Sequence, residues 1–394
     1  MWYWQLVFAA VVLQGFCAVA ASPDVFIGSS GLGHVTPAAT FPFGMVQAGP
    51  DTSAKPDRFS PDWPHTCGYQ HGDMWLWRFS QTHISGTGCA SFGDVAVLPV
   101  VEGFDGLTTP AKMLKTTERA EPGYYAVGLE ENAVRIFCEM TVLAHTAAYR
   151  FAYPKGARAR ILVDLDWGIG SLSSEKCWNR RVLSSRESFP SETELHGWRE
   201  VWCWNDYRLG YALSFSAPIA AKRQLRQAGD GRGSVYELDF GTLVDGVLEL
   251  RIGLSSTSVE SAVANLTSEM PRFDFASAHR MSRNAWKDIL SRLEIDPKTD
   301  KDIAANFHAA LYRTLLQPND LGDVGGKPAY STFSLWDTFR AAHPLYTLVA
   351  PERVAGMVNS MLDQYDRQGY LPIWALGGSE NHCMIGHHAV PVIA

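Results

Sequence analysis

Charge is scarce in this sequence, and several familiar motifs are absent. Only 19% of the 394 residues are Asp, Glu, Lys or Arg, and the formal net charge is −7. No block of Lys and Arg occurs, which argues against nucleic acid as a partner because phosphate backbones are bound through clustered positive charge. The sequence also has no P-loop lysine and no GxGxxG, so the common nucleotide-binding loops are excluded. The cysteines include no CxxC pair, which argues against a zinc site.

Long apolar runs are missing after the N-terminal region. The chain carries no charge before Asp24, and an apolar run precedes the small residues Ala18 to Ala20. This pattern predicts a signal peptide over residues 1–20, with an uncleaved anchor as the alternative. No later segment is long and apolar enough to span a bilayer. We therefore expect an exported protein, periplasmic, extracellular or secreted, without a stable membrane span after signal cleavage.

Cysteine is present in a number that permits disulfides. One of the seven cysteines, Cys17, would leave with the signal peptide. An even number in an exported chain is compatible with disulfide bonds. Cys67 and Cys89 flank a glycine-rich segment and could pair, but free buried thiols explain the spacing equally well. The six remaining cysteines are Cys67, Cys89, Cys138, Cys177, Cys203 and Cys383.

The length and an apolar content of 46% predict two or three domains with sizeable cores. From about residue 90 to 255, short β-branched and aromatic segments alternate with turn residues, which predicts a β-sandwich. Apolar residues then recur at helical spacing over 272–296, 299–316 and 351–369. The expected domain order is a β-sandwich domain over 22–270, a linker helix over 271–298, and an incomplete helical domain over 299–394.

Two glycine-rich segments are candidates for ligand contact. Phe26–Thr52 is either a loop held tightly by glycine turns or a loop whose backbone N–H groups and His34 face a site. Gly68–Asp94 combines alternating aromatic residues, as in a strand, with His71 and His83. A metal site is one interpretation of these histidines and the nearby aspartates, but the spacing does not show that such ligands converge.

The stretch STFSLWDTFRAAHPL, Ser331–Leu345, combines an aromatic ring, a carboxylate, a guanidinium and the imidazole of His343. At helical spacing Trp336 lies beside Arg340, and Asp337 and Arg340 could pair at i, i+3. The neighbouring residues are apolar, so the stretch is expected to be a buried helix, where an ion pair is costly. A structural salt bridge is the bland explanation. A pocket for sugar hydroxyls is the functional one, because the carboxylate accepts hydrogen bonds and the guanidinium donates them.

The stretch GYLPIWALGGSENHCMIGHHAVP, Gly369–Pro391, is a second candidate. Glu380 and Asn381 lie among three histidines after a glycine pair, and Trp374 could stack on a ligand. Glu380 is a solvated surface charge, a ligand-binding carboxylate or an acid catalyst.

These segments resemble glycoside hydrolase family 92, the calcium-dependent exo-α-mannosidases. FIGSSGLGHVTPAATFPFGMVQAGPDT resembles the N-terminal signature of the family, and GYQHGDMWLWRFSQTHISGTGCASFGDVAVLP resembles its GY…FSxTHLSGTGxxxxGDxxxxP segment. FHAALYRTLLQPN, the stretch from YSTFSLWD to GYLPIW, and GGSENHCMIGHHAVPVIA follow in family order. The departures from the family pattern are Val35, Ala38 and Ser379.

The resemblance implies a β-sandwich followed by an (α/α)6 barrel, truncated in this chain, with the active site between the two. It implies hydrolysis of terminal α-mannose from N-glycans or mannans with inversion, assisted by Ca²⁺. It also implies that residues of both domains bind the terminal mannose, namely Gly28, Gly33, His34, His83, Trp336, Asp337, Arg340, Glu380 and Asn381.

Inverting glycosidases need a general acid and a general base on opposite faces of the sugar. By resemblance, both carboxylates and most Ca²⁺ ligands are expected beyond Ala394, so the chain alone is expected to be inactive. Glu380 is the best acid candidate within the chain, although we expect it to bind substrate first. Two alternatives are a non-catalytic glycan-binding or inactive fragment, and a glucosidase or phosphorylase with a similar two-domain plan.

Overall fold

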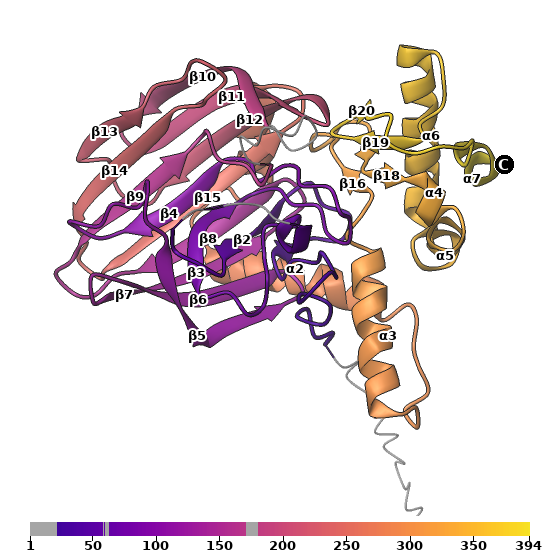
Figure 1. Cartoon of the computed structure of the whole chain (residues 1–394), viewed down its shortest axis with the longest axis horizontal. Helices are drawn as coiled ribbons and strands as arrows, with labels where there is room; N and C mark the ends of the chain where they lie inside the picture. The colour runs from indigo at the N-terminus through magenta and orange to yellow at the C-terminus, as the bar shows by residue number, and fades with distance from the viewer. Residues whose placement is uncertain (1–21, 58, 60–62, 171–179) are drawn as a thin grey trace, which may run out of the picture.

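The computed structural model describes residues 22–57, 59, 63–170 and 180–394, so the predicted signal peptide lies outside the described residues. A β domain is followed by a helical domain (Figure 1). The strands of the β domain are β1 (Ala39–Thr40), β2 (Gln47–Ser53), β3 (Trp75–Ser80), β4 (Ala96–Val100), β5 (Ala111–Glu121), β6 (Tyr124–Glu131), β7 (Val134–Val142), β8 (Thr146–Ala152), β9 (Arg158–Asp164), β10 (Arg181–Ser191), β11 (Glu194–Cys203), β12 (Asn205–Phe215), β13 (Ala221–Arg226), β14 (Val235–Thr242) and β15 (Val247–Ser255). A short 3₁₀ helix spans Trp63–His65.

The strands form one antiparallel sheet that folds back on itself into two packed layers. Its order is β10-β11-β12-β15-β8-β7-β6-β5-β3-β4-β9-β14-β13, and β2 pairs with β3. β3 is the corner, because it pairs with both β5 and β4. Rings meet across the layers, with Phe79 6.5 Å from Tyr125 and Phe215 5.1 Å from Phe240 between ring centroids. The alternating apolar residues of the strands thus fill a single core between the layers.

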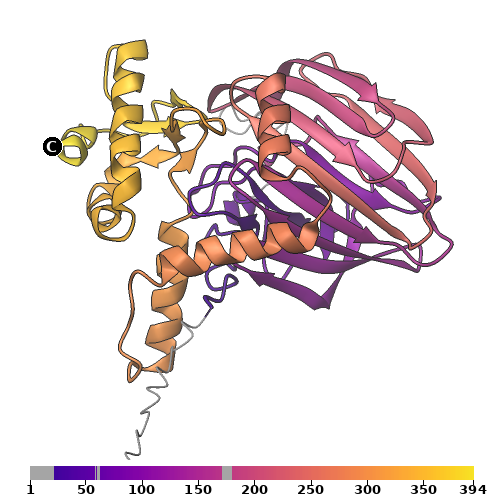
Figure 2. The same cartoon turned by 180° about the vertical axis from the view of Figure 1, so that it is seen from behind.

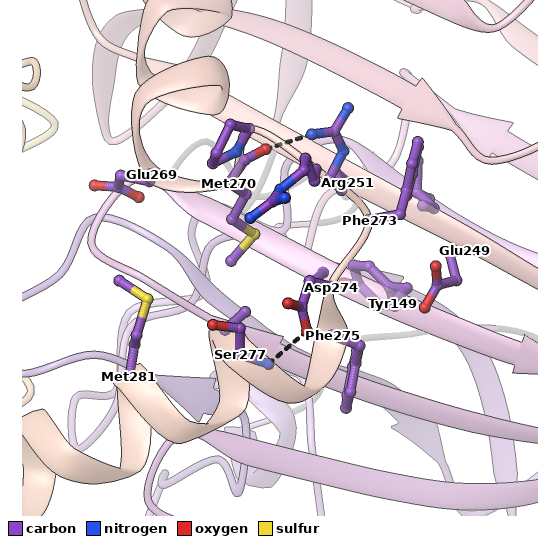
Figure 3. A pocket seen from close by; sticks show the side chains of 15 residues that line it. Tyr149, Glu249, Arg251, Glu269, Met270, Phe273, Asp274, Phe275, Ser277 and Met281 are labelled. Carbon is purple, nitrogen blue, oxygen red and sulfur yellow. Dashed lines mark hydrogen bonds between the residues drawn. The ribbon is translucent and has the colours of Figure 1, made fainter.

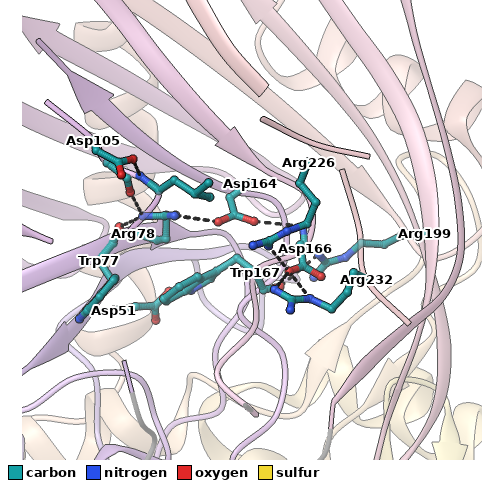
Figure 4. A network of polar contacts seen from close by, with 12 residues as sticks. Asp51, Trp77, Arg78, Asp105, Asp164, Asp166, Trp167, Arg199, Arg226 and Arg232 are labelled. Atoms are coloured by element: carbon teal, nitrogen blue, oxygen red, sulfur yellow. Dashed lines mark hydrogen bonds and ion pairs between the residues drawn. The ribbon is translucent and has the colours of Figure 1, made fainter. Parts of the chain in front are cut away.

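Two buried aspartates, Asp164 and Asp166, pair with arginines at one end of this sandwich (Figure 4). Arg78 is 1% exposed, and its Nε donates to Asp164 Oδ2 at 2.9 Å. Asp166 accepts from Arg226 at 2.7 Å and from Arg232 at 2.6 Å. Because a lone buried charge is very unfavourable, these pairs fix which loops can close this end of the sandwich.

Three helices follow the sheet, namely α1 (Val259–Glu269), α2 (Phe275–Leu290) and α3 (Lys301–Thr314). Each begins at a side-chain cap: the oxygens of Ser258, Asp274 and Asp300 accept from backbone N–H groups of the first turn. α1 packs on β12 and β15, while α2 packs on β7 and β8, so both lie across one face of the sheet (Figure 2). α1 lies within the predicted β-sandwich domain, 22–270, where the sequence predicted no helix. Its apolar stripe is short and interrupted by Ser, Asn and Thr.

The remaining elements form the helical domain around a second core. α6 begins with Pro351 in its first turn and ends at Gly369, whose φ is +84°, as the sequence predicts. The elements are β16 (Asn319–Asp320), β17 (Tyr330–Ser331), β18 (Phe333–Ser334), α4 (Leu335–Thr338), α5 (Ala342–Val349), α6 (Pro351–Gln368), β19 (Trp374–Leu376), β20 (Ser379–Glu380) and α7 (Ala389–Ile393). No helix in the described part of the chain has the length and hydropathy needed to cross a membrane.

The segment around β1 joins the two domains. The Thr40 carbonyl accepts from Trp286 Nε1 of α2 at 2.6 Å, and the Thr40 hydroxyl lies 2.8 Å from the Tyr312 hydroxyl of α3. Phe43 is fully buried in the core of the helical domain, and its N–H donates to the Leu315 carbonyl at 2.9 Å. The loops of the β domain that follow this segment are therefore held against the helices.

The structure decides one of the cysteine alternatives. Cys67 is buried and has a free thiol, which donates to the Tyr69 carbonyl at 3.3 Å. Burial raises the pKa of this thiol to about 12. The pairing of Cys67 with Cys89 is therefore not formed. Cys177 lies outside the described residues.

Candidate active site between the two domains

A cavity of about 280 Å³ lies between the β domain and the helical domain, and we call it the interdomain cleft. The loop after β3 supplies one wall. The end of α3, the β18–α4 turn, α5 and β19 supply the other. The lining residues are Ser85, Gly86, Thr87, Arg313, Thr314, Gln317, Pro318, Thr332, Phe333, Ser334, Thr338, Ala342, His343, Tyr346 and Trp374.

The wall from the β domain is held by His34. Its carbonyl accepts from the Gly86 N–H at 2.6 Å. Its Nδ1 lies 2.8 Å from the Thr66 hydroxyl, which donates its proton to the Thr87 carbonyl at 3.0 Å. Because that proton is used, Nδ1 must donate to the Thr66 oxygen. Burial lowers the pKa of His34, so the neutral ring keeps Nε2 as an acceptor.

Gly28 and Gly33 shape the loop that carries His34. A Cβ at Gly33 would lie 1.9 Å from the Gly28 carbonyl oxygen, which is far inside contact distance. Gly28 also has a φ of +85°, a conformation that side chains disfavour. Both glycines are exposed, and neither lines the interdomain cleft. The backbone conformation of the loop therefore explains why glycine occupies these two positions. Their contact with substrate stays a prediction.

Glu380 is bound by the backbone rather than aimed into the cleft. The side chain is buried, and its Oε2 accepts from the Ile373 N–H at 2.7 Å. Both oxygens accept from the Trp374 N–H at 3.1 Å, and Oε1 accepts from the His382 N–H at 3.0 Å. Such bonds to a carboxylate are strong. In this geometry Glu380 holds Trp374, which lines the cleft, and its carboxylate is engaged away from any acid role.

Asn381 completes this loop. Its Oδ1 accepts from the Cys383 N–H at 2.8 Å, and its backbone N–H donates to the Trp374 carbonyl at 3.2 Å. Its buried Nδ2 has no hydrogen-bond partner among the described residues. A buried donor without a partner is costly, so this amide would gain from a hydrogen-bond acceptor supplied by a ligand or water.

The stretch 331–345 is not the buried helix that the sequence predicts. It contains two short strands, the four-residue helix α4 and the start of α5, and both Asp337 and Arg340 are exposed. Asp337 Oδ2 accepts from the Ser334 hydroxyl at 2.5 Å. Arg340 lies over the rings of Trp336 and Phe339, at 4.6 and 4.8 Å from the ring centroids. Solvent reaches both charges, so the assumed cost of burial does not apply.

The expected pair of Asp337 and Arg340 is also absent. Among the residues that the structure describes, the two side chains form no ion pair. Asp337 is not itself a lining residue of the interdomain cleft, although its hydrogen-bond partner Ser334 is.

His83 lies deeper inside the β domain. Its Nδ1 donates to the Gln47 carbonyl at 2.7 Å, and its Nε2 lies 3.1 Å from Asp51 Oδ1, with both side chains fully buried. Asp51 also accepts from Trp167 Nε1 at 2.6 Å. His83 borders a smaller cavity of about 40 Å³, which has room for about one water molecule and shares the lining residue Thr332 with the interdomain cleft. His83 itself is not a lining residue of the interdomain cleft.

The histidines and aspartates of the second glycine-rich segment do not converge on a metal. Asp73 binds His65 at 2.8 Å, and Asp94 binds Arg199. Within residues 22–57, 59, 63–170 and 180–394, no group of three or more His, Cys, Asp or Glu could hold a metal ion. The metal-site interpretation of these histidines and aspartates is therefore not supported by their contacts.

Two residues of the cleft were not predicted as site residues. Arg313 Nη2 donates to the Ile27 carbonyl at 3.1 Å, and Nη1 donates to the Thr36 carbonyl at 3.3 Å, so α3 anchors the glycine-rich loop. Its carbonyl partners lie far away in the sequence, and no sequence pattern indicates that they bind an arginine. His343 is buried among Phe333 and Tyr346, and burial lowers its pKa to about 4.

Comparison with known families accounts for both domains. Residues 24–255 match the glycosyl hydrolase family 92 N-terminal domain, and residues 261–394 match the glycosyl hydrolase family 92 catalytic domain. The chain belongs to glycosyl hydrolase family 92 (GH92). The cleft described above thus lies between the two domains that define this family.

Known proteins resemble this GH92 chain over most of its length. A GH92 α-mannosidase from Bacteroides thetaiotaomicron, solved with mannoimidazole, is 26% identical with a TM-score of 0.83, covering 95% of this chain and 52% of that one. An inverting GH92 mannosidase from the same species matches with a TM-score of 0.76 at 22% identity, covering 94% and 51%. A protein of Arthroderma benhamiae named an uncharacterized secreted glycosidase is 25% identical, covering 94% and 48%.

The predicted fold class is confirmed by these structures: an N-terminal β-sandwich domain is followed by part of the helical domain of GH92 enzymes. The chain spans about half the length of the relatives it matches. Both domain matches support the assignment as a glycoside hydrolase.

Proposed function

We propose that this chain is part of an exported, calcium-dependent exo-α-mannosidase that removes terminal α-mannose from N-glycans or mannans with inversion. The observation that carries the proposal is the interdomain cleft, which is built from both GH92 domains. Support for the sugar comes from the solved α-mannosidase in complex with mannoimidazole. Support for export comes from the name of the Arthroderma relative, a secreted glycosidase.

The cleft suits the non-reducing end of a glycan. Its volume of about 280 Å³ is near the lower end of ligand pockets, which span roughly 300–1,000 Å³, so it suits one sugar ring. Trp374 and Tyr346 offer apolar ring surface, while Ser334 and Thr338 offer hydroxyls. His343 contributes a neutral imidazole above pH 5, because burial lowers its pKa to about 4. Together these groups can bind and orient a neutral sugar.

The same cleft lacks the groups that hydrolysis needs. No Asp or Glu is among its lining residues in the described part of the chain. An inverting enzyme requires two carboxyl groups roughly 6.5–9.5 Å apart. We propose that the acid, the base and the Ca²⁺ ligands lie in the part of the GH92 fold that this chain does not span. On this proposal the 394-residue chain binds mannose but does not hydrolyse mannosides.

A glycan-binding role without catalysis is the second candidate, and the absence of carboxylates from the cleft favours it for this chain taken alone. A glucosidase or phosphorylase with the same plan is the third, and it predicts activity on glucosides. The three proposals differ in what they bind and cleave, so one set of assays separates them.

The test compares the 394-residue chain with a full-length GH92 protein that contains it. Aryl α-mannoside and aryl α-glucoside hydrolysis are measured with Ca²⁺ and with EDTA, and early product anomers are read by NMR. We expect EDTA-sensitive release of β-mannose by the longer protein only. Binding of methyl α-mannoside to both proteins, weakened by Trp374→Ala, is expected for the cleft. Turnover by the 394-residue chain would contradict the assignment of both carboxylates to the missing part.

A further inference from the structure

A second cavity, of about 270 Å³, lies away from the interdomain cleft, between strands β8 and β15 and the connection from α1 to α2 (Figure 3). We call it the α1–α2 cavity. It shares no lining residue with the interdomain cleft. A single water occupies about 30 Å³ of liquid, so this space holds several waters or one small organic group.

Arg251 of β15 is fixed beside this cavity. One of its terminal nitrogens donates to the Met270 carbonyl, and Nη2 donates to the Ser214 hydroxyl at 3.0 Å. The guanidinium lies over the Phe273 ring, 4.2 Å from the centroid. Its buried Nε has no hydrogen-bond partner among the described residues. The side chain is therefore held in place, while the second N–H of each terminal nitrogen can still donate to a ligand.

Carboxylates line the same cavity. Asp274 uses Oδ1 to cap α2, where it accepts from the Ser277 N–H at 2.9 Å, and Figure 3 shows its side chain beside those of Ser277 and Phe275. Glu249 has Arg150 as its nearest cation, at 3.9 Å, and burial raises the pKa of its carboxyl. Glu269 is already bound by His145 and Thr146 at 2.7 Å. Glu249 and Asp274 thus retain oxygens that can accept hydrogen bonds.

The lining selects the chemistry of the ligand. Three carboxylates and the guanidinium groups of Arg251 and Arg272 line the cavity. Arg150 and His145 pair with two of those carboxylates from outside it, so the charges nearly balance and no ion of either sign is strongly favoured. A purely apolar ligand would remove these charges from water without compensation. A neutral polyol can hydrogen-bond both kinds of charged group, because its hydroxyls donate to carboxylates and accept from a guanidinium. Phe273 and Phe275 supply the apolar surface that the C–H face of a sugar ring contacts.

We propose that the α1–α2 cavity is a second carbohydrate site that binds one neutral glycosyl unit of the glycan, with Glu249, Asp274 and Arg251 as its polar contacts. That the bound unit is mannose rests on the proposed function. The existence of the site does not depend on it. A second site on the β domain would hold a branched or polymeric glycan while the interdomain cleft takes its terminal residue.

The test uses the 394-residue chain with ¹³C-methyl methionine, because Met281 lines the α1–α2 cavity and is 51% exposed, whereas Met357 is buried in the other core. Methyl α-mannoside, methyl α-glucoside and methyl β-galactoside are titrated in turn. We expect saturable shifts of the Met281 methyl with the mannoside and none at Met357. The Trp374→Ala variant, altered in the interdomain cleft, should keep the Met281 response.

Two variants of the cavity make the test specific. Ser277→Trp fills the space and keeps the backbone N–H that Asp274 caps. Glu249→Gln changes one acceptor, and Glu130→Gln is its matched control, a strand glutamate that pairs with Arg135 outside the cavity. We expect Ser277→Trp to abolish the Met281 shifts, Glu249→Gln to weaken binding at least tenfold, and Glu130→Gln to leave it unchanged.

The outcomes separate the two proposals. If none of the three glycosides shifts the Met281 methyl resonance, the second site is overturned, whatever the interdomain cleft binds. Unchanged affinity in Glu249→Gln would also overturn it, even if Ser277→Trp failed to fold. Met281 shifts with the glucoside or galactoside but not the mannoside would support the site and contradict mannose as its ligand.

Discussion

Both carboxylate oxygens of Glu380 accept a hydrogen bond from the backbone N–H of Trp374, each at 3.1 Å. A carboxylate placed in this way orders the strand and turn that present the Trp374 ring to the interdomain cleft. Glu380 reaches the interdomain cleft through Trp374 rather than directly, so it is a positioning residue in this chain.

Glu380→Gln should destabilise the helical domain. The amide nitrogen cannot accept from a backbone N–H, so at least one buried donor loses its partner, at a cost of about 1–3 kcal/mol. Urea unfolding followed by tryptophan fluorescence measures this, and methyl α-mannoside affinity should fall in parallel because Trp374 is released. Glu352→Gln is the control, because its ion pair with Arg292 is exposed and should matter little. If Glu380→Gln has the same urea midpoint of unfolding as the wild type, Glu380 does not stabilise the loop that carries Trp374.

Asp164→Ala should be among the most damaging substitutions in the β domain. It would leave Arg78, which is 1% exposed, as a buried charge without its carboxylate, at a cost of about 3–5 kcal/mol. The double variant Arg78→Met with Asp164→Ala should recover part of that loss, because both charges are then gone. Denaturant unfolding of the two variants against Glu237→Gln, which alters the exposed pair with Arg223, tests this. Equal stability of the single and double variants would argue against a charge effect.

Glu131 predicts a fall in stability as the pH rises. Burial raises the pKa of Glu131 from 4.5 to about 8, so the folded protein holds this proton more tightly than the unfolded chain. Its contribution to stability is complete below pH 4.5, decreases between about 4.5 and 8, and is lost above that range. Thermal melts across this range should show a shallower pH dependence for Glu131→Gln than for the wild type. Parallel pH profiles for the two proteins would rule out the assigned titration.

Because of His343, we expect stability to depend on pH in the opposite direction at acid pH. Burial lowers its pKa from 6.5 to about 4, so the unfolded chain takes up the proton first and stability falls as the pH drops from 6.5 to about 4. Its ¹³Cε1 resonance, followed by NMR across this pH range, should titrate near 4. A His343 midpoint close to 6.5 would show that the ring is open to water.

Much of the fold could be predicted from the sequence, because local periodicity decides it. Strands such as β7, β8 and β9 and helices α2, α3 and α6 lie where alternation or helical spacing placed them. The stop of α6 at Gly369 follows from the left-handed conformation that glycine readily adopts. The ordered motifs also identified the GH92 family, which both domain matches confirm.

The roles of individual charges were decided only by the tertiary structure. Asp337 and Glu380 are both acids predicted from the sequence to bind substrate, yet one is exposed to solvent and the other accepts from three backbone N–H groups. Arg313 binds carbonyls of the N-terminal loop, which no local pattern reveals. Periodicity along a chain fixes which face of an element is buried, but the partner of a polar group depends on which distant segment packs against that face, and only the folded chain sets that.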